Sequence, residues 1–322
     1  MDIITYKKIN KTRLYDTYWE FACKRQEIFM NRVTNKTSSK NTDPILKKYK
    51  FTNVYRASDR ASQYLIKNVI YNNEYSDEDI IFRILLFKLF NKIETWEAVE
   101  KCVGEITYSN FSKDRYAKVF NTLYKQGKKL YSGAYIMASG KNYFGHDRKY
   151  MNHLELLEYM MKDNLTNRIH DCKTLDELYA ILLNYPSIGK FLAYQYAIDI
   201  NYSNITDFDE MEFVVAGPGA KSGINKCFMG STYSDSYLIE YMANNQEQEF
   251  TRLGLKFRDL WGRKLQLIDC QNLFCETDKY TRVKFPDIEG INGRKKIKQL
   301  YKQNNKRIEY FYPPKWNLKI GD

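Results

Sequence analysis

The sequence lacks any long apolar run, and no stretch approaches the roughly 18 residues that a membrane-spanning helix requires. Its opening, MDIITYKKINKTR, has neither the apolar core nor the small-residue cleavage site of a signal peptide. We therefore expect a cytoplasmic protein that has no membrane partner.

Metal-binding residues are also sparse. The three histidines, His146, His153 and His170, do not have the spacing of zinc ligands, and among the six cysteines only Cys270 and Cys275 lie close together. A chain of 322 residues can bury a large core without disulfides. We therefore expect reduced cysteines, no metal site and no cofactor.

Positive charge, by contrast, is abundant. Lys and Arg number 51 against 39 Asp and Glu, which gives a formal net charge of +12. Contacts between basic side chains and phosphates release condensed counterions, so nucleic acid is the expected partner. The abundance of Lys, Asn, Ile and Tyr is also typical of proteins encoded by AT-rich genomes, so charge alone does not decide the matter.

Apolar residues recur at helical spacing over the first two thirds of the chain, and few segments alternate as strands do. The spacing predicts helices from Leu14 to Met30 and over residues 56–71, 77–91, 95–103, 113–126, 152–161, 175–183, 189–202 and 234–244. We expect an all-α monomer with an N-terminal helix and polar loop (1–50), a helical body (51–260), and a C-terminal helix with a basic tail (261–322). The tail beyond residue 290 favours either an arm along the DNA backbone or a solvated helix.

The stretch LLNYPSIGKFLA, residues 182–193, runs from one helix through a tight turn into another. It resembles the helix-hairpin-helix motif, here over about residues 175–202, whose turn presents backbone N–H groups to a DNA phosphate. Ser187, Ile188, Gly189 and Lys190 are the candidate phosphate-binding residues, although Ser187 stands where the motif usually has its first glycine. An ordinary helix–helix corner is the alternative.

Asp209 lies 20 residues after Gly189. Helix-hairpin-helix DNA glycosylases carry a catalytic Asp at this distance, where it stabilises the positive charge that develops on the deoxyribose as the base leaves. In the loop expected over residues 203–224, Asp209 is the candidate catalytic residue and Glu210 its only substitute. The lysine nucleophile of strand-nicking members would fall at Phe191, so we expect no lyase activity. A solvated acidic loop is the alternative.

A glycine-rich segment, VVAGPGAKSGI, follows at residues 214–224. Gly217, Gly219 and Lys221 can bring backbone N–H groups and an ammonium to an anion such as a DNA phosphate. The segment is not a Walker A loop, because Val215 and Ala220 occupy the required glycine positions.

Five segments carry a family resemblance: FTNVYRASDR (51–60), FKLFNKIETW (87–96), SGAYI (132–136), the glycine-rich segment, and FCETDKYTR (274–282). With the hairpin, they resemble the alpha-glutamyl/putrescinyl thymine pyrophosphorylase family from about Thr12 to Arg282. The resemblance implies a fold like that of helix-hairpin-helix DNA glycosylases. It also implies a role in building hypermodified thymines in phage DNA, by replacing a pyrophosphate on 5-hydroxymethyluracil with an amine.

The same segments supply a candidate base pocket. Its residues are Asn53, Tyr55, Arg56, Asp59, Arg60, Asn91 and Trp96. Arg56, Asp59 and Arg60 fall one helical turn apart and can form an ion-pair network or hold a phosphate, and a buried structural Arg/Asp pair is the alternative. Trp96 follows a strongly apolar helix, where it either stacks on a base or fills the core.

Two enzymatic hypotheses and one non-enzymatic hypothesis follow. The first is a monofunctional DNA N-glycosylase that flips a bulky modified pyrimidine out of double-stranded DNA and excises it, for example in defence against phages. The second is a transferase that joins an amino acid or polyamine to an activated 5-hydroxymethyluracil. The third is a DNA-binding module without chemistry. The Asp209 spacing favours excision, because it matches a known bond-breaking chemistry. In addition, nothing in the sequence marks a site for an amine donor.

Overall fold

The computed structural model describes residues 9–34, 43–303 and 309–320. Over these residues it contains 14 α-helices and no named strand, only two isolated β-bridges. The expected all-α class is confirmed. None of the helices in the described ranges is long and apolar enough to cross a membrane.

The chain forms two compact units. The first, here the terminal unit, comprises residues 1–59, 213–308 and 318–322, and the second, the central unit, comprises residues 60–212 and 309–317. Each unit is therefore assembled from segments that are far apart in the sequence.

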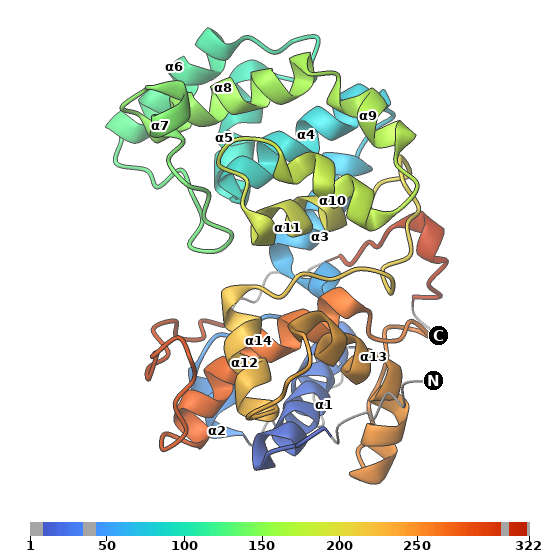
Figure 1. Cartoon of the computed structure of the whole chain (residues 1–322). Helices are drawn as coiled ribbons and strands as arrows, with labels where there is room; N and C mark the ends of the chain where they lie inside the picture. The colour runs from blue at the N-terminus through green and yellow to red at the C-terminus, as the bar shows by residue number, and fades with distance from the viewer. Residues whose placement is uncertain (1–8, 35–42, 304–308, 321–322) are drawn as a thin grey trace, which may run out of the picture. The chain divides into compact units, whose positions relative to one another are not determined.

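The terminal unit is built around two closely packed helices, α12 and α14 (Figure 1). Its elements are α1 (Arg13–Val33), α2 (Pro44–Lys48), the 3-10 turn η1 (Arg56–Ser58), α12 (Pro218–Cys227), α13 (Asp235–Arg252) and α14 (Leu267–Lys284). A Cβ added at Gly223 would lie 2.1 Å from the Phe274 carbonyl oxygen, and one at Gly219 would lie 2.3 Å from Cys275 Sγ. These two glycines therefore allow the backbones of α12 and α14 to approach closely.

The close approach of α12 and α14 corrects the expectation of a glycine-rich loop. Most of residues 217–223 are helical, because Pro218 is well suited to the first helical position and Gly219 and Gly223 are required by the contact with α14. Local glycine content predicts a loop, but tertiary packing decides the conformation here.

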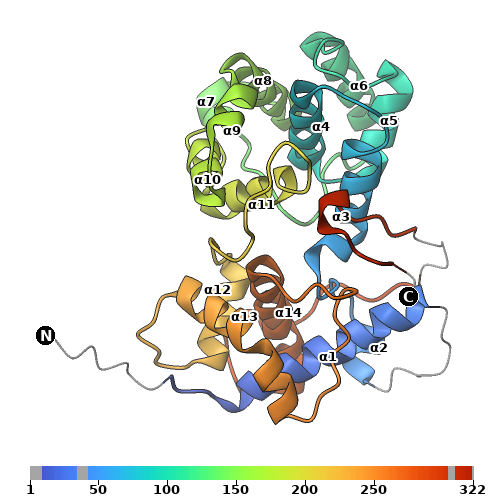
Figure 2. The ribbon, with the colours of Figure 1, turned by 90° about the vertical axis from the view of Figure 1, so that its right-hand side faces the viewer.

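The central unit is organised around α4. Its elements are α3 (Arg60–Tyr64), the π-helical turn η2 (Leu65–Ile70), α4 (Asp77–Phe90), α5 (Ile93–Val103), α6 (Lys113–Lys125), α7 (Lys141–Phe144), α8 (Lys149–Lys162), α9 (Leu165–Asp171), α10 (Leu175–Leu183), α11 (Lys190–Ile200) and the 3-10 turn η3 (Pro314–Trp316). Every residue of α4 from Ile81 to Phe90 is buried, and α5 and α8 lie on either side of it (Figure 2). Ser76 caps its N-terminus and Asn91, in the left-handed conformation, ends it.

Arg83 of α4 shapes the chain that precedes this helix. Its guanidinium is fully buried and donates to the carbonyl oxygens of Val69 (2.7 Å), Asn68 (3.1 Å) and Ile106 (2.8 Å). The first two of these bonds satisfy carbonyls at the end of the π-helical turn η2. The single helix expected over residues 56–71 is therefore wrong, and a 3-10 turn, a short α-helix and a π turn take its place.

Two further expectations concern polar segments. Residues 35–42 of the expected polar loop lie outside the described residues, and Pro44–Lys48 forms α2. The basic tail forms no helix over residues 290–303 and 309–320 apart from η3, so the solvated-helix alternative is wrong for these residues. Part of the tail instead pairs with the chain after α2, where Lys50 N–H donates to the Gln299 carbonyl (3.0 Å) and Tyr301 N–H to the Lys48 carbonyl (3.0 Å).

Candidate functional site

Two of the sequence motifs, 51–60 and 274–282, meet in the terminal unit. The Thr52 N–H donates to the Glu276 carboxylate on α14 (2.9 Å). Asn272 Nδ2, one turn earlier on α14, donates to Thr52 Oγ1 and to the Asn53 carbonyl, both at 3.1 Å. Side chains of α14 therefore hold the first motif by its backbone, although the two segments lie more than 200 residues apart in sequence.

Asp59 closes a turn within the first motif. Its carboxylate accepts from the Asn53 N–H (2.7 Å), and Asn53 Nδ2 donates to the Ser58 carbonyl (2.7 Å). Arg25 on α1 donates to Asn53 Oδ1 (2.5 Å) and to the Thr52 carbonyl (2.9 Å). Burial raises the pKa of Asp59 to about 6, against the opposing effects of the Asn53 N–H and the Arg25 charge. The turn is therefore fixed by hydrogen bonds on both sides.

The other candidates of this motif have separate environments. Tyr55 is buried, and its hydroxyl donates to the Arg263 carbonyl (2.6 Å). Arg56 is only 2% exposed, and its N–H donates to Asp269 Oδ1 (2.8 Å). Arg60 belongs to the central unit, where it is exposed and lies 3.6 Å from the Glu94 carboxylate.

A buried charge cluster explains the rest of the 274–282 motif. Asp278 accepts from Ser222 Oγ (2.9 Å), is ion-paired with Lys226 (3.0 Å) and with Arg282, and accepts from Asn292 Nδ2 (3.1 Å). Burial alone would raise its pKa, but the hydrogen bond from Arg282 and the charge of Lys226 outweigh burial and leave the pKa of Asp278 lowered. The cluster ties α12 and the chain around residue 292 to α14.

The remaining anion-binding candidates of the terminal unit lie at the start of α12. Gly217 is its N-cap residue, and Gly219 contacts Cys275. Lys221 is exposed, with its ammonium 3.7 Å from the Asp235 carboxylate. In this arrangement Gly219 serves the packing of α12 on α14.

The central unit brings together the motifs 87–96 and 132–136 with the second helix of the hairpin. Lys88 Nζ lies 2.7 Å from Asp199 Oδ2, and the two side chains are 3% and 1% exposed. The Tyr135 ring covers the Lys88 ammonium, 4.3 Å from ring centre to nitrogen, and stacks on Phe191 at 5.9 Å and 14°. We call Lys88, Tyr135, Phe191 and Asp199 the Lys88 cluster.

Sequence reasoning missed Lys88 and Asp199, although a signal was present. Each is a charged residue within a mostly apolar helical run, FRILLFKLF (82–90) for Lys88 and FLAYQYAIDI (191–200) for Asp199. Lys and Asp are almost never fully buried unless they are paired, so each run predicts a partner elsewhere. Tyr135 has φ +54°, a conformation that bulky residues rarely adopt, and no sequence pattern marks it.

The hairpin has the expected elements. α10 and α11 pack on each other, and the turn between them covers residues 184–189. Ser187 has φ +66°, so it adopts the left-handed conformation for which glycine is usual. Ile188 is buried, Gly189 is the N-cap residue of α11, and Gly189 and Lys190 are exposed. The phosphate-binding role of these four residues stays a prediction.

The acidic loop that follows is organised by Asn201. Its amide accepts from the Phe208 N–H (3.0 Å) and donates to the Phe208 carbonyl (2.9 Å). Asp209 is exposed, and its carboxylate accepts from the Met211 N–H (2.8 Å), whereas Glu210 is buried.

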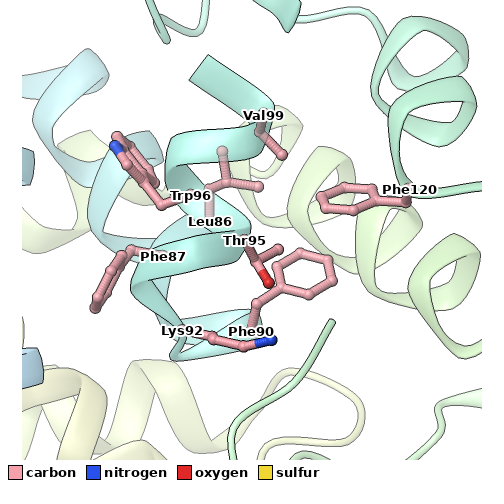
Figure 3. A pocket seen from close by; sticks show the side chains of 8 residues that line it. All are labelled: Leu86, Phe87, Phe90, Lys92, Thr95, Trp96, Val99 and Phe120. Atoms are coloured by element: carbon pink, nitrogen blue, oxygen red, sulfur yellow. The ribbon is translucent and has the colours of Figure 1, made fainter. Parts of the chain in front are cut away.

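Trp96 lies beside a small cavity in the central unit. Trp96, Phe87, Phe90 and Phe120 line a space of about 10 Å³ (Figure 3). A volume of this size holds one water molecule at most, so Trp96 fills the core in this structure and has no room to stack on a base. Asn91 caps α4, and its Nδ2 donates to Ser132 Oγ (3.3 Å).

Comparison with known proteins decides the family. Residues 12–290 match the family described as "5-hmdU DNA kinase, helical domain". The chain belongs to this family. It is 26% identical over 288 residues to the 5-hmdU DNA kinase of Bacillus phage SP10, an alignment that covers 83% of this chain and 45% of the relative. The chain thus spans less than half the length of that relative. No solved structure matches the chain.

The family corrects the expected activity. A monofunctional glycosylase that hydrolyses the N-glycosyl bond is wrong, because the family is named for kinases of 5-hmdU DNA, which transfer a phosphoryl group. The Asp209 spacing therefore indicated the wrong reaction. The broader expectation, a phage-related family that modifies hydroxymethyluracil, is confirmed, and the second hypothesis was closer than the first.

Proposed function

We propose that this chain is a DNA-recognition component in the phosphorylation of 5-hydroxymethyluracil in double-stranded DNA. Its role is to bind the duplex and to present the modified base to phosphoryl transfer. The observation that carries this proposal is the match of residues 12–290 to the helical domain of the 5-hmdU DNA kinases. The net charge of +12 supports a polyanionic partner.

Phosphoryl transfer needs little covalent help from a protein, since positioning and electrostatic stabilisation do most of the work. A helical component that fixes the acceptor hydroxyl of the base therefore contributes directly to the rate. The described part of the chain supports such positioning, because the Asp59 turn, the Asp278 cluster and the Lys88 cluster all hold loops or helices rigidly by buried polar contacts.

The central unit also carries a segment rich in exposed basic side chains. Between residues 125 and 149 there are six Lys or Arg and one acid, Asp147. Lys125, Lys128, Lys129, Lys141 and Arg148 are exposed. These residues, and Gly189 and Lys190 of the hairpin turn, are our candidates for contacts with the phosphate backbone, and backbone contacts set the register of a protein on DNA.

Binding and transfer can be tested together. Fluorescence anisotropy with otherwise identical duplexes should show tighter binding to DNA that contains 5-hydroxymethyluracil than to DNA that contains thymine. Incubation of the same duplexes with radiolabelled ATP shows whether the chain transfers phosphate by itself or only with a nucleotide-binding partner. Equal affinity for the two duplexes would refute base recognition.

A further inference from the structure

A pocket of about 410 Å³ lies in the central unit beside the hairpin turn. One wall is formed by residues 138–143, including Lys141, Asn142 and Tyr143, and the other by the turn residues Asn184, Pro186 and Ser187. Small-molecule sites have volumes of roughly 300–1,000 Å³, so the pocket is large enough for one nucleotide. The cavity at Trp96, with a volume of about 10 Å³, is too small for a nucleotide.

Helix α8 fixes the first wall through buried polar side chains. Asn152 is 1% exposed, and its Nδ2 donates to the carbonyls of Ser139 (3.0 Å) and His146 (2.9 Å). Its Oδ1 accepts from the His146 N–H (2.9 Å). One buried amide therefore holds the segment on both sides of α7.

His153, the next residue on α8, holds the start of the same wall. Burial lowers its pKa to about 4, so the imidazole is neutral at pH 7. Its Nε2 lies 2.8 Å from the Ala138 carbonyl and its Nδ1 lies 3.0 Å from the Tyr131 hydroxyl. A carbonyl can only accept, so Nε2 carries the proton and Nδ1 accepts from the tyrosine. The wall is thus held in place by hydrogen bonds from α8.

The two walls meet at Gly140. Its φ is +71°, and a Cβ there would lie 3.3 Å from Ser187 Oγ and 3.2 Å from Asn152 Cβ. Ser187 lines the pocket from the opposite wall in its own left-handed conformation. The unusual backbone at Gly140 and Ser187 therefore belongs to one feature, the junction where the two walls of the pocket meet.

The pocket offers the groups that a nucleotide requires. Tyr143 is 63% exposed, and Phe144 supports its ring at 4.9 Å between ring centres. The side-chain amides of Asn142 and Asn184 make no hydrogen bond within the described part of the chain, and an amide pairs with the N3–H and O4 groups of a uracil ring. Lys141 forms an exposed pair with Asp147 (2.7 Å), which contributes little stability and is easily exchanged for a phosphate.

We propose that this pocket binds the 5-hydroxymethyluracil base after the base has left the helix. The ring stacks on Tyr143, and Lys141 faces the adjacent phosphate. One of the two amides, Asn142 or Asn184, pairs with the O4 and N3–H edge that thymine shares, and the other contacts the 5-hydroxymethyl group that thymine lacks. This inference rests on the proposed function, and it identifies where that function recognises the base.

The test uses the full chain and a duplex in which 2-aminopurine stands next to 5-hydroxymethyluracil. The fluorescence of 2-aminopurine rises when the neighbouring 5-hydroxymethyluracil leaves the stack. Tyr143→Ala should weaken the preference for modified DNA about 5- to 150-fold, the effect of losing one stacked base. It should also abolish the fluorescence rise. Tyr143→Phe keeps the ring and should behave as wild type. Tyr237→Ala, at an exposed tyrosine of the terminal unit, is the matched control.

The outcomes separate the two proposals. A wild-type chain that does not distinguish the modified duplex from thymine DNA would overturn the proposed function and this inference with it. A wild-type chain that does distinguish them, with a Tyr143→Ala variant that keeps both the preference and the fluorescence rise, would overturn the pocket alone.

Discussion

The Lys88–Asp199 pair gives a quantitative test of how the central unit is held together. At 2.7 Å and an effective dielectric constant near 20, the two charges attract by about 6 kcal/mol. Each buried ion loses several kcal/mol of hydration, so the pair as a whole contributes little net stability. Lys88→Met removes the attraction but leaves Asp199 buried, and we expect it to lower the free energy of unfolding by about 3–5 kcal/mol.

The double variant Lys88→Met, Asp199→Leu removes both charges and should recover most of that loss. Urea denaturation gives the free energies, and hydrogen exchange of peptides from α4 and α11 assigns the change to the central unit. Because the pair lies beneath Tyr135, the double variant should also retain its affinity for DNA. A single variant that costs less than about 1 kcal/mol, or a double variant as unstable as the single one, would refute the account.

Three further predictions follow from other contacts. His153 has a lowered pKa of about 4, so the free energy of unfolding should fall by about 3 kcal/mol as the pH drops from 6.5 to 4. Urea titrations should show that His153→Gln removes this dependence. The raised pKa of Asp59 acts in the opposite direction, lowering stability as the pH rises towards 6, and comparison of the variant with wild type cancels its effect. Gly223→Ala should destabilise the terminal unit by about 2 kcal/mol or more in thermal melts, whereas Gly133→Ala, with no atom within 4 Å of the added Cβ, should be neutral. Lys190→Gln should reduce the slope of log affinity against log salt by about one, with the exposed Lys264→Gln as control, and an unchanged slope would remove Lys190 from the interface.

Helices with a clear apolar period and a cap were predictable from the sequence. Residues 175–183 were predicted as a helix with the bounds that α10 has, because Thr174 caps it and its apolar face is regular. Helix α12 was not predicted, because glycines such as Gly219 and Gly223 are typical of loops. Their role in a helix becomes clear only from the close packing against α14. The break between Arg56 and Tyr71 depends on Arg83, which is distant in sequence from the carbonyls it binds.

The candidate site divides in the same way. Ser187 was correctly placed in a hairpin turn, but its left-handed conformation and its contact with Gly140 depend on a loop more than 40 residues earlier. The apolar runs around Lys88 and Asp199 mark both residues as buried charges, but neither run indicates which residue is the partner. The spacing from Gly189 to Asp209 predicted the wrong reaction, because related scaffolds carry different chemistries and spacing alone does not identify the bond that is broken.

A separate physical question is why a kinase of this base would draw it out of the helix at all. The C5 substituent of a thymine-type base already lies in the major groove, where its hydroxyl is open to a phosphate donor. Thymine differs from 5-hydroxymethyluracil by that one hydroxyl, and in an open groove water competes for every hydrogen bond that would detect it. A pocket with fixed polar walls discriminates more strongly, because the analogue that lacks the hydroxyl leaves protein groups unpaired. The proposed flipping into the pocket beside Ser187 would therefore serve to discriminate between the two bases. Loss of Tyr143 should then weaken the choice between the two bases by the same factor of about 5 to 150, while the salt-dependent affinity for DNA remains.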